Sequence, residues 1–303
     1  MLALALPLYP DRAVPLLARA AADLPYEADA WYWLARSQLE FGLPEDAVAT
    51  IRQGLSRLDT SGQFAPAAPR LPETAAVRAV EIRRSERAPL LGVLGESLVR
   101  LGRADEALPV LDEAVAALPK DGWLAGVQAQ ALAVQAGAPP SLLANPTFDR
   151  DGSWSIRTPI RVDNKQWTLD MLLNETPNIS DGVARFAPQI PDSRILTQDV
   201  FRLAPDRRYR LTVRVRAEGL GDGAVMAFMA PAATMSTTEP PEAAPWIART
   251  SAAGEWTTLT IETDPGTRLT GILMVAIGFT AETRPGAVLW CDEATLVVMG
   301  DVR

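Results

Sequence analysis

The stretch ADAWYWLARSQLEFGLPEDAVATIRQGLSRLD, residues 28–59, decides the fold of the first half of the chain. Trp31 and Leu34 recur at helical spacing, so they lie on one face of a helix. Gly42 ends this helix, because glycine readily adopts the left-handed conformation found after a helix C-terminus. Pro44 opens a second helix, where its missing N–H leaves no hydrogen bond unmade. The stretch therefore predicts two packed helices joined by a short turn.

Small residues mark the places where these two helices cross closely, namely Ala35, Ala47 and Gly54. The same arrangement recurs downstream and upstream, at Leu94, Gly95, Gly102, Ala107, Leu111, Ala114 and Pro119 and at Ala13, Leu17, Ala20 and Pro25. Ala13 and Ala47 lie 34 residues apart, which is the period of the tetratricopeptide repeat. The first half therefore resembles that family, whose pattern is a Trp, a Leu-Gly/Ala pair, a turn Gly and spaced Ala residues.

This resemblance implies an α-helical solenoid of tetratricopeptide type over residues 1–138, with a groove that binds a protein partner. A last helix, from Trp123 to about Gln135, resembles a closing cap for the array. Gly137 and the two prolines that follow Ala138 end it, because paired prolines cannot continue a helix.

The repeat is expected to be irregular over residues 60–87. Ala47 and Ala107 lie 60 residues apart, which is short of two full periods. The segment TSGQFAPAAPRLP, residues 60–72, is rich in Pro and Ala and is typical of a loop. A helix is expected over residues 73–87, where four arginines indicate a solvated face.

The array also begins in the middle of a repeat. By the 34-residue period, the repeat that contains Ala13 should start before Met1, which leaves only an apolar remnant at residues 2–8. Two interpretations follow. Either the chain is a fragment of a longer or membrane-anchored parent protein, or residues 2–8 pack against a partner.

From Ser141 the periodicity changes from helical to alternating. Around residues 208–216, apolar side chains point to one side and arginines, with Thr212, point to the other, which indicates a half-buried strand with a basic outer face. Further strands are expected at residues 183–186, 224–229, 257–262, 273–279, 287–291 and 295–298. Many short strands with Gly, Pro and Asp between them predict an all-β jelly-roll sandwich over residues 139–303.

The two ends of this half carry a second resemblance. It opens with LLANPTFD, residues 142–149, followed by Trp154, and it closes with LWCDEATL, residues 289–296. Between them stand QDV, LAP, YRL and GEWTTL, at residues 198–200, 203–205, 209–211 and 254–259. In this order the segments resemble jelly-roll carbohydrate-binding modules, which are galactose-binding-like sandwiches. The family pattern has Leu-Leu-x-Asn-Gly-x-Phe-Glu at the start and Asp-Asp-Val-x-Leu at the end.

In such modules a structural calcium often ties the first strand to the last, and Asp149 and Asp292 match the positions that would bind it. Calcium prefers six to eight oxygen ligands from carboxylates and carbonyls. The alternative is that both carboxylates cap turns. Asp149 stands where the family has Glu, and Glu293 stands where it has a second Asp, so this chain departs from the pattern at the expected site.

Sugar binding needs aromatic faces for pyranose rings and polar groups for the hydroxyls. Trp154 and Trp256 match family positions that are usually in the core. Trp167 and Trp246 stand in more polar or loop-like contexts and are the candidate ligand contacts. Arg210 and Arg214 share the outer face of their strand, where they either pair with uronate or phosphate groups or are simply solvated.

Composition excludes several classes of activity. The chain has no histidine, so general-base and nucleophile pairs built on histidine are excluded. Its single cysteine, Cys291, excludes an internal disulfide. A net charge of −8 argues against nucleic-acid binding, which needs a dense basic surface. The acidic residues of the second half form no recognisable glycosidase pair, so we expect no enzyme activity.

The sequence thus predicts a non-catalytic scaffold or adaptor. Its repeats are expected to bind a protein partner, and its sandwich a glycan or polysaccharide, as suits polysaccharide assembly, export or anchoring. The alternative is a module that acts only in protein–protein interaction, with a sandwich that binds no sugar, because a fold does not specify a function. An extracytoplasmic location is expected if the chain is a fragment of a longer protein.

Overall fold

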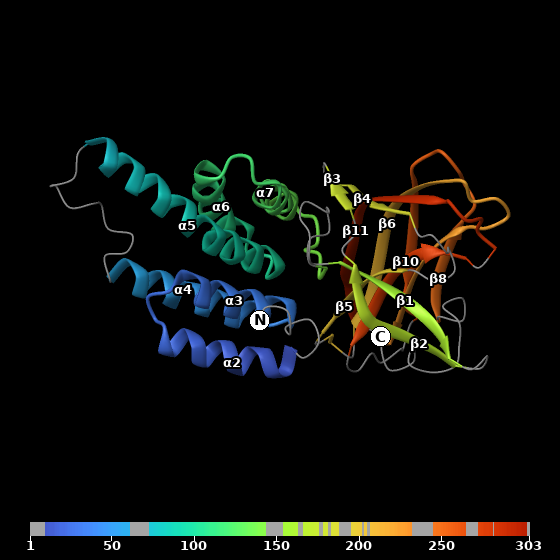
Figure 1. Cartoon of the computed structure of the whole chain (residues 1–303), viewed down its shortest axis with the longest axis horizontal. Coiled ribbons are helices and arrows are strands. Elements are labelled where there is room, and N and C mark those ends of the chain that lie inside the picture. Colours follow the sequence, from blue (N-terminus) through green and yellow to red (C-terminus); the bar gives the residue numbers. More distant parts are fainter. Residues whose placement is uncertain are drawn as a thin grey trace. The chain divides into compact units, whose positions relative to one another are not determined.

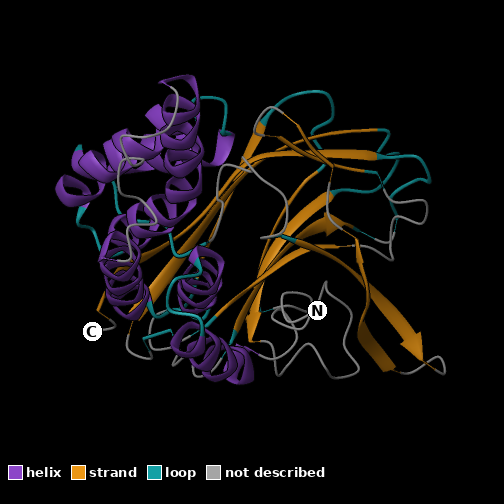
Figure 2. Ribbon diagram, turned by 60° about the vertical axis from the view of Figure 1, so that its left-hand side comes forward, coloured by secondary structure: helices purple, strands orange, loops and turns teal. Residues whose placement is uncertain are grey.

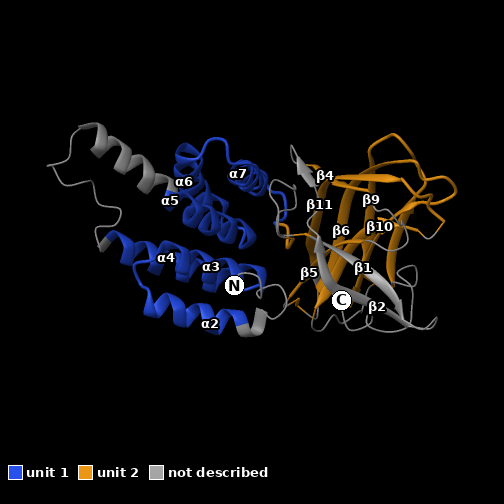
Figure 3. Cartoon of the chain, in the orientation of Figure 1, with its two compact units in different colours: residues 1–140 blue, residues 141–303 orange. Residues whose placement is uncertain are grey.

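The structure is a computed structural model of the whole chain. It describes residues 10–60, 73–143, 154–162, 166–175, 178–180, 183–187, 195–201, 203–204, 207–231, 245–264, 272–280 and 282–301. The chain divides into two compact units, Met1–Pro140 and Ser141–Arg303, close to the expected boundary after residue 138 (Figure 3). Among the described residues, helices form the first unit and strands form the second (Figure 2).

The first unit is a series of paired helices (Figure 1). In chain order they are α2 (Pro10–Asp23), α3 (Ala28–Glu40), α4 (Pro44–Thr60), α5 (Glu73–Arg100), α6 (Ala104–Ala117) and α7 (Gly122–Gln135). Each helix contacts the next one, and α3 also contacts α5, which contacts α7. This pattern of neighbours is typical of stacked helical hairpins, in which alternate helices form one layer.

Three of these helices end in the same way, at a glycine with positive φ. Gly42, Gly102 and Gly137 follow α3, α5 and α7, with φ of 73°, 71° and 99°. After α3, the N–H of Gly42 donates to Leu39 and the N–H of Leu43 donates to Gln38, at 3.1 and 2.8 Å. The same pair of bonds recurs after α5 and α7. These bonds satisfy carbonyls that a helix C-terminus otherwise leaves unpaired.

Glycines inside the helices make room for large side chains of the neighbouring helix. A Cβ at Gly54 would lie 2.6 Å from Cγ of Trp31, and one at Gly95 would lie 2.4 Å from Cδ2 of Leu111. Trp31 is buried, and its Nε1 donates to the carbonyl of Pro25 at 3.0 Å. The small residues predicted at helix crossings therefore lie directly against the large ones.

The irregular middle of the array contains one long helix. The expected helix over residues 73–87 runs on to Arg100, so that α5 spans 28 residues and includes the Leu94-Gly95 motif. Most of the predicted loop, residues 61–72, lies outside the described residues. Within α5, Arg87 forms salt bridges with Asp59 of α4 at 2.7 Å and with Glu113 of α6 at 3.2 Å. No helix in the described part of the chain is both long and apolar enough to span a membrane.

The second unit contains two antiparallel sheets. The strands are β1 (Ser155–Val162), β2 (Gln166–Glu175), β3 (Asn178–Ser180), β4 (Val183–Phe186), β5 (Ile195–Val200), β6 (Arg207–Glu218), β7 (Val225–Pro231), β8 (Trp246–Thr250), β9 (Thr257–Glu262), β10 (Leu273–Phe279) and β11 (Val288–Asp301). Sheet A has the order β2-β1-β5-β10-β7-β8, and sheet B has the order β3-β4-β11-β6-β9. The expected fold class, a helical repeat array followed by an all-β sandwich, is confirmed.

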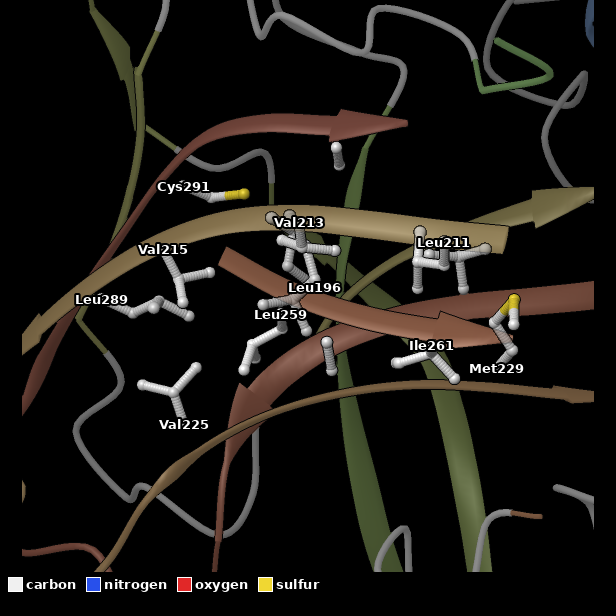
Figure 4. Close-up of a cluster of buried hydrophobic side chains, with 14 of the residues drawn as sticks. Leu196, Leu211, Val213, Val215, Val225, Met229, Leu259, Ile261, Leu289 and Cys291 are labelled. Atoms are coloured by element: carbon white, nitrogen blue, oxygen red, sulfur yellow. The ribbon is translucent and has the colours of Figure 1, made fainter. Parts of the chain in front are cut away.

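The core of the sandwich is built from alternate residues of both sheets. Leu211, Val213 and Val215 of β6 are buried with Leu259 and Ile261 of β9. Their side chains lie together with Val225 and Met229 from sheet A, as Figure 4 shows. Because strand side chains alternate in direction, the residues between these core positions lie on the outer face of sheet B.

Sheet A carries a second apolar cluster on its other face. Met226, Phe228 and Met274 belong to this cluster and are at most 2% exposed, together with Ile195, Ala230 and Ala276. In β7 and β10 they alternate with residues of the main core. The outer faces of the two sheets therefore differ: that of sheet A is apolar and buried at these positions, and that of sheet B is polar.

Candidate functional site

The outer face of sheet B is rich in arginine, threonine and carboxylate side chains. On β6 the core residues alternate with Arg208, Arg210, Thr212, Arg214 and Arg216, as the sequence predicts. The neighbouring strands add Arg185, Trp290, Thr295, Thr258, Thr260 and Glu262 to the same face. Three threonines, Thr295, Thr212 and Thr260, stand directly opposite one another across β11, β6 and β9.

One row of this face contains two tryptophans. Trp290 on β11 pairs with Arg185 on β4 and with Arg216 on β6. Trp256 directly precedes β9, whose first residue, Thr257, pairs with Val215, and the guanidinium of Arg214 lies over its ring. We call Arg185, Trp290, Arg216 and Trp256 the tryptophan row. The strands β11 and β9 lie on either side of β6, two strand spacings or roughly 9–10 Å apart.

Each tryptophan of the row carries an arginine over its ring. The guanidinium carbon of Arg214 lies 5.1 Å from the ring centroid of Trp256. That of Arg216 also lies 5.1 Å from the ring centroid of Trp290. Such cation–π contacts hold flat side chains in one orientation. Trp256 is 37% exposed and Trp290 is half-buried, so both rings keep part of their surface open to solvent.

The four arginines of β6 that lie on the outer face of sheet B are paired with carboxylates. Glu262 accepts from Arg210 at 2.8 Å and from Arg208 at 3.1 Å. Arg214 donates to Asp292, and Arg216 donates to Glu218 at 2.5 Å. Arg185 differs, because it is exposed and no carboxylate among the described residues pairs with it.

A β-bulge brings Asp292 to Arg214. The register between β11 and β6 shifts between Cys291 and Glu293, so that one residue of β11 is left over. Cys291 and Ala294 on either side remain in the core. The bulge therefore places two successive carboxylates, Asp292 and Glu293, beside Arg214 on the outer face of sheet B.

The structure places the predicted aromatic contacts differently from the tryptophan row. Trp246 is only 6% exposed and belongs to the sandwich core, and its Nε1 donates to Asp264 at 3.2 Å. A ring buried in this way offers little surface to a sugar. Trp167 lies in β2 of sheet A, with its side chain outside the described residues. Trp154 is buried in the core, as its family position implies.

Only one of the two residues of the expected calcium site, Asp292, lies within the described part of the chain. Asp149 lies outside the described residues. Asp292 is bonded to the guanidinium of Arg214, whose positive charge competes with a cation for the same carboxylate. Within the described residues there is also no cluster of three or more His, Cys, Asp or Glu side chains that would hold a metal ion.

The tryptophan row was only partly visible in the sequence. The alternation in β6 correctly indicates which arginines share a face. Trp290 stands in an apolar run between Leu289 and Cys291, which predicts burial for all three residues. Strict alternation along the strand would instead place Trp290 on the outer face, because Leu289 and Cys291 are in the core. Trp256 stands before its strand begins, at a position for which the family resemblance implies burial, whereas it is 37% exposed.

The first unit contains a buried ion-pair cluster on the layer formed by α3, α5 and α7. Arg36 donates to Glu96 and Glu40, at 2.7 Å in both cases, and Arg100 donates to Glu96 at 2.9 Å. Nε1 of Trp123 donates to the same Glu96 carboxylate at 3.1 Å. Burial alone would raise the pKa of Glu96, but Arg36 and Arg100 outweigh it and lower that pKa. This cluster joins three helices and has its charges matched internally.

The layer of α3 also carries exposed aromatic surface. The rings of Tyr32 and Trp33 are in edge-to-face contact, with centroids 5.1 Å apart. Trp33 is 39% exposed, and Tyr26, just before α3, is 57% exposed. Aromatic side chains of this kind are enriched at protein interfaces.

Several solved structures resemble part of the chain. One is described as "CBM4 structure and function", with 13% identity and a TM-score of 0.35, covering 52% of this chain and 99% of that one. Another is a xylan-binding module, CBM15, with 15% identity, a TM-score of 0.35, and coverage of 48% and 92%. A third is a putative sugar-binding protein from Bacteroides thetaiotaomicron, with 13% identity, a TM-score of 0.29, and coverage of 52% and 100%.

Family models match the first unit. Residues 10–68 match one model described as tetratricopeptide repeat, and residues 53–122 match a second with the same description. A comparison with curated proteins finds no match to the sequence. The helical pairs, the glycines at their ends and the two matches agree, so the first unit is an array of tetratricopeptide repeats.

Proposed function

We propose that the protein is a non-catalytic adaptor that binds a protein partner through its repeats and a glycan through the outer face of sheet B. The observation that carries the glycan half is the tryptophan row. Two partly exposed rings lie on the outer face of sheet B, each with an arginine over it. An extended sugar chain laid along this row would meet both rings.

The chemistry of the row suits a sugar ligand. A pyranose has an apolar face that packs on an aromatic ring, and hydroxyl groups at its edge that need hydrogen-bond partners. Trp290 and Trp256 supply the rings. Arg216 on the intervening strand, and Thr258 opposite Arg214, supply hydrogen-bond donors and acceptors close to the rings.

The protein-binding half of the proposal rests on the repeats. Such arrays bind peptides or helices along one layer of helices. The exposed aromatic side chains of Trp33 and Tyr26 lie on or beside α3, and the nearby cluster around Glu96 is already neutralised. We therefore propose a partner segment with apolar or aromatic side chains rather than a strongly charged one.

The test is a glycan screen of the full chain with three variants. We expect Trp256→Ala and Trp290→Ala each to weaken binding of the selected glycan at least tenfold. Val298→Ala is the control, because Val298 is an exposed apolar residue of β11 outside the tryptophan row. If the folded protein binds no glycan, or binds one equally well without either tryptophan, the outer face of sheet B is not a sugar site. The face would then be tested as a protein-docking surface.

A further inference from the structure

We propose that Arg185 and Trp290 form a subsite for an acidic sugar, whose ring packs on Trp290 and whose anionic group binds Arg185. The inference rests on the proposed glycan function and adds the class of sugar. The anionic group is a carboxylate or a sulfate ester, since both present oxygens that a guanidinium binds in a fork.

The first argument is the distribution of charge on the outer face of sheet B. Carboxylates of the protein pair with the four outer-face arginines of β6: Glu262 accepts from Arg208 and Arg210, and Asp292 and Glu218 each accept from one. A ligand anion at Arg210 or Arg214, the arginines predicted to bind uronate or phosphate, would have to displace one of these carboxylates. Arg185 is exposed and has no such partner among the described residues. The available positive charge is therefore at Arg185.

The second argument is the position of Arg185 relative to Trp290. The two residues are direct cross-strand partners in the β4–β11 pair. Ala184 and Phe186 beside Arg185, and Leu289 and Cys291 beside Trp290, are all in the core. Arg185 and Trp290 therefore lie on the same outer face, with Cβ atoms about 5 Å apart. At that spacing the guanidinium reaches a substituent at the edge of a sugar ring that packs on Trp290.

The third argument concerns β6, the strand on the opposite side of β11 from Arg185, whose Arg216 already contacts Trp290. Arg216 lies over the ring at 5.1 Å and is itself bonded to Glu218 at 2.5 Å. It therefore acts as a fixed support for the ring, with its charge matched. Arg185, at the other side of Trp290, is the group left to distinguish an acidic sugar from a neutral one.

The experiment uses pairs of polysaccharides that differ only in charge. The full chain is tested by affinity electrophoresis and calorimetry against polygalacturonate and its methyl ester, glucuronoxylan and its carboxyl-reduced form, and dextran sulfate and dextran. We expect the charged member of at least one pair to bind about tenfold more tightly, as one charge-assisted hydrogen bond allows. The carboxylate and sulfate pairs distinguish the two anionic groups.

Variants of the arginines locate the effect. Arg185→Gln should remove the preference for the charged member, so that the charged and neutral members of a pair bind with nearly equal affinity. Arg185→Lys should keep part of the preference, because it keeps the charge and loses the fork. Arg208→Gln is the matched control, because Arg208 lies on the same face but is paired with Glu262. Thermal unfolding of each variant confirms that the protein is folded.

The outcomes separate this inference from the proposed function. If binding depends on Trp290 and Trp256 but Arg185→Gln leaves the ratio between charged and neutral members unchanged, the acidic subsite is wrong and the glycan function stands. Equal binding of both members in every pair has the same meaning. If no polysaccharide binds, or if binding ignores both tryptophans, both proposals are overturned.

Discussion

Arg214 on β6 lies over the ring of Trp256, 5.1 Å from its centroid, and the same guanidinium donates to Asp292 on β11. Three segments far apart in the sequence thus meet at one arginine. The contact depends on the bulge at Asp292, which presents that carboxylate on the outer face of sheet B. It holds the exposed ring at the end of the tryptophan row.

This contact is expected to have a measurable energy. A double-mutant cycle with Arg214→Ala and Trp256→Ala should give a coupling of about 0.5–1 kcal/mol in urea unfolding, the range for exposed cation–π pairs. Arg208→Ala combined with Trp256→Ala is the control, because Arg208 pairs with Glu262 instead. Coupling within error of zero for the first pair would mean that the observed stacking does not stabilise the protein.

The buried carboxylate of Glu96 should be essential for the first unit. Glu96→Ala leaves Arg36 and Arg100 without their shared partner in a site that is 4% exposed at Glu96. Breaking a buried ion pair in this way costs about 3–5 kcal/mol. Unfolding followed by circular dichroism at 222 nm measures it, and Glu113→Ala, in an exposed pair with Arg87, should cost less than about 1 kcal/mol. Equal effects would contradict the assigned role of the cluster.

The same carboxylate should make the first unit sensitive to acid. Arg36 and Arg100 lower the pKa of Glu96 in the folded protein despite its burial. The ionised Glu96 carboxylate therefore contributes its full stabilisation at pH values above the pKa of a Glu side chain in the unfolded chain, about 4.3. This stabilisation is lost as the pH falls through the lower, folded pKa. Urea unfolding between pH 2 and 6 should therefore show a loss of helical stability below about pH 4. In Glu96→Gln this part of the pH dependence should be flatter, and an unchanged slope would exclude Glu96 as its source.

Gly54 is predicted to tolerate no side chain. A Cβ there would lie 2.6 Å from Cγ of the buried Trp31, so Gly54→Leu forces α3 and α4 apart. Overpacking of this kind costs about 1–3 kcal/mol. Ala18→Leu, at an exposed position of α2, is the control and should be nearly neutral. A Gly54→Leu protein with unchanged thermal stability would show that the two helices separate freely.

Cys291 provides a specific reporter of the sandwich. It is 1% exposed in the core, and burial raises the pKa of its thiol well above the ordinary value. Since the thiolate is the reactive form, modification by a disulfide reagent should be slow in the native protein and fast in urea. The chain has one cysteine, so the rate reports opening of this core alone. Rapid modification at neutral pH without denaturant would contradict the burial of Cys291.

Much of the local structure could be predicted from residue spacing. The 34-residue period, the glycines after α3 and α5 and the small residues opposite Trp31 are local patterns, so the helical repeats were predictable. The length of α5 could not be predicted in the same way. A segment rich in Pro and Ala precedes this helix, and no capping residue separates residues 73–87 from the motif at Leu94. Alternation in β6 likewise predicted which arginines share a face.

The binding face shows where such patterns end. Trp246 and Trp256 both stand near strand ends, in contexts that do not reveal their burial. The structure buries the first against the core and exposes the second beside Arg214. The difference comes from the segments that pack beside each residue: the sandwich core and Asp264 for Trp246, and Arg214 for Trp256. The residues next to Trp246 and Trp256 in the sequence do not indicate which segments will pack beside them.

The sequence by itself determined the helical repeats, the change to strands after Ser141 and the basic face of β6, because each depends on periodicity over a few residues. Only the tertiary structure decided which arginines are neutralised and which tryptophans share a row. Those properties depend on strand order, which brings Arg185, Trp290 and Arg216 into line across β4, β11 and β6, and on a one-residue bulge, which brings Asp292 to Arg214. Register pairs residues that are distant in the chain, so it is set by the packing of the whole sandwich.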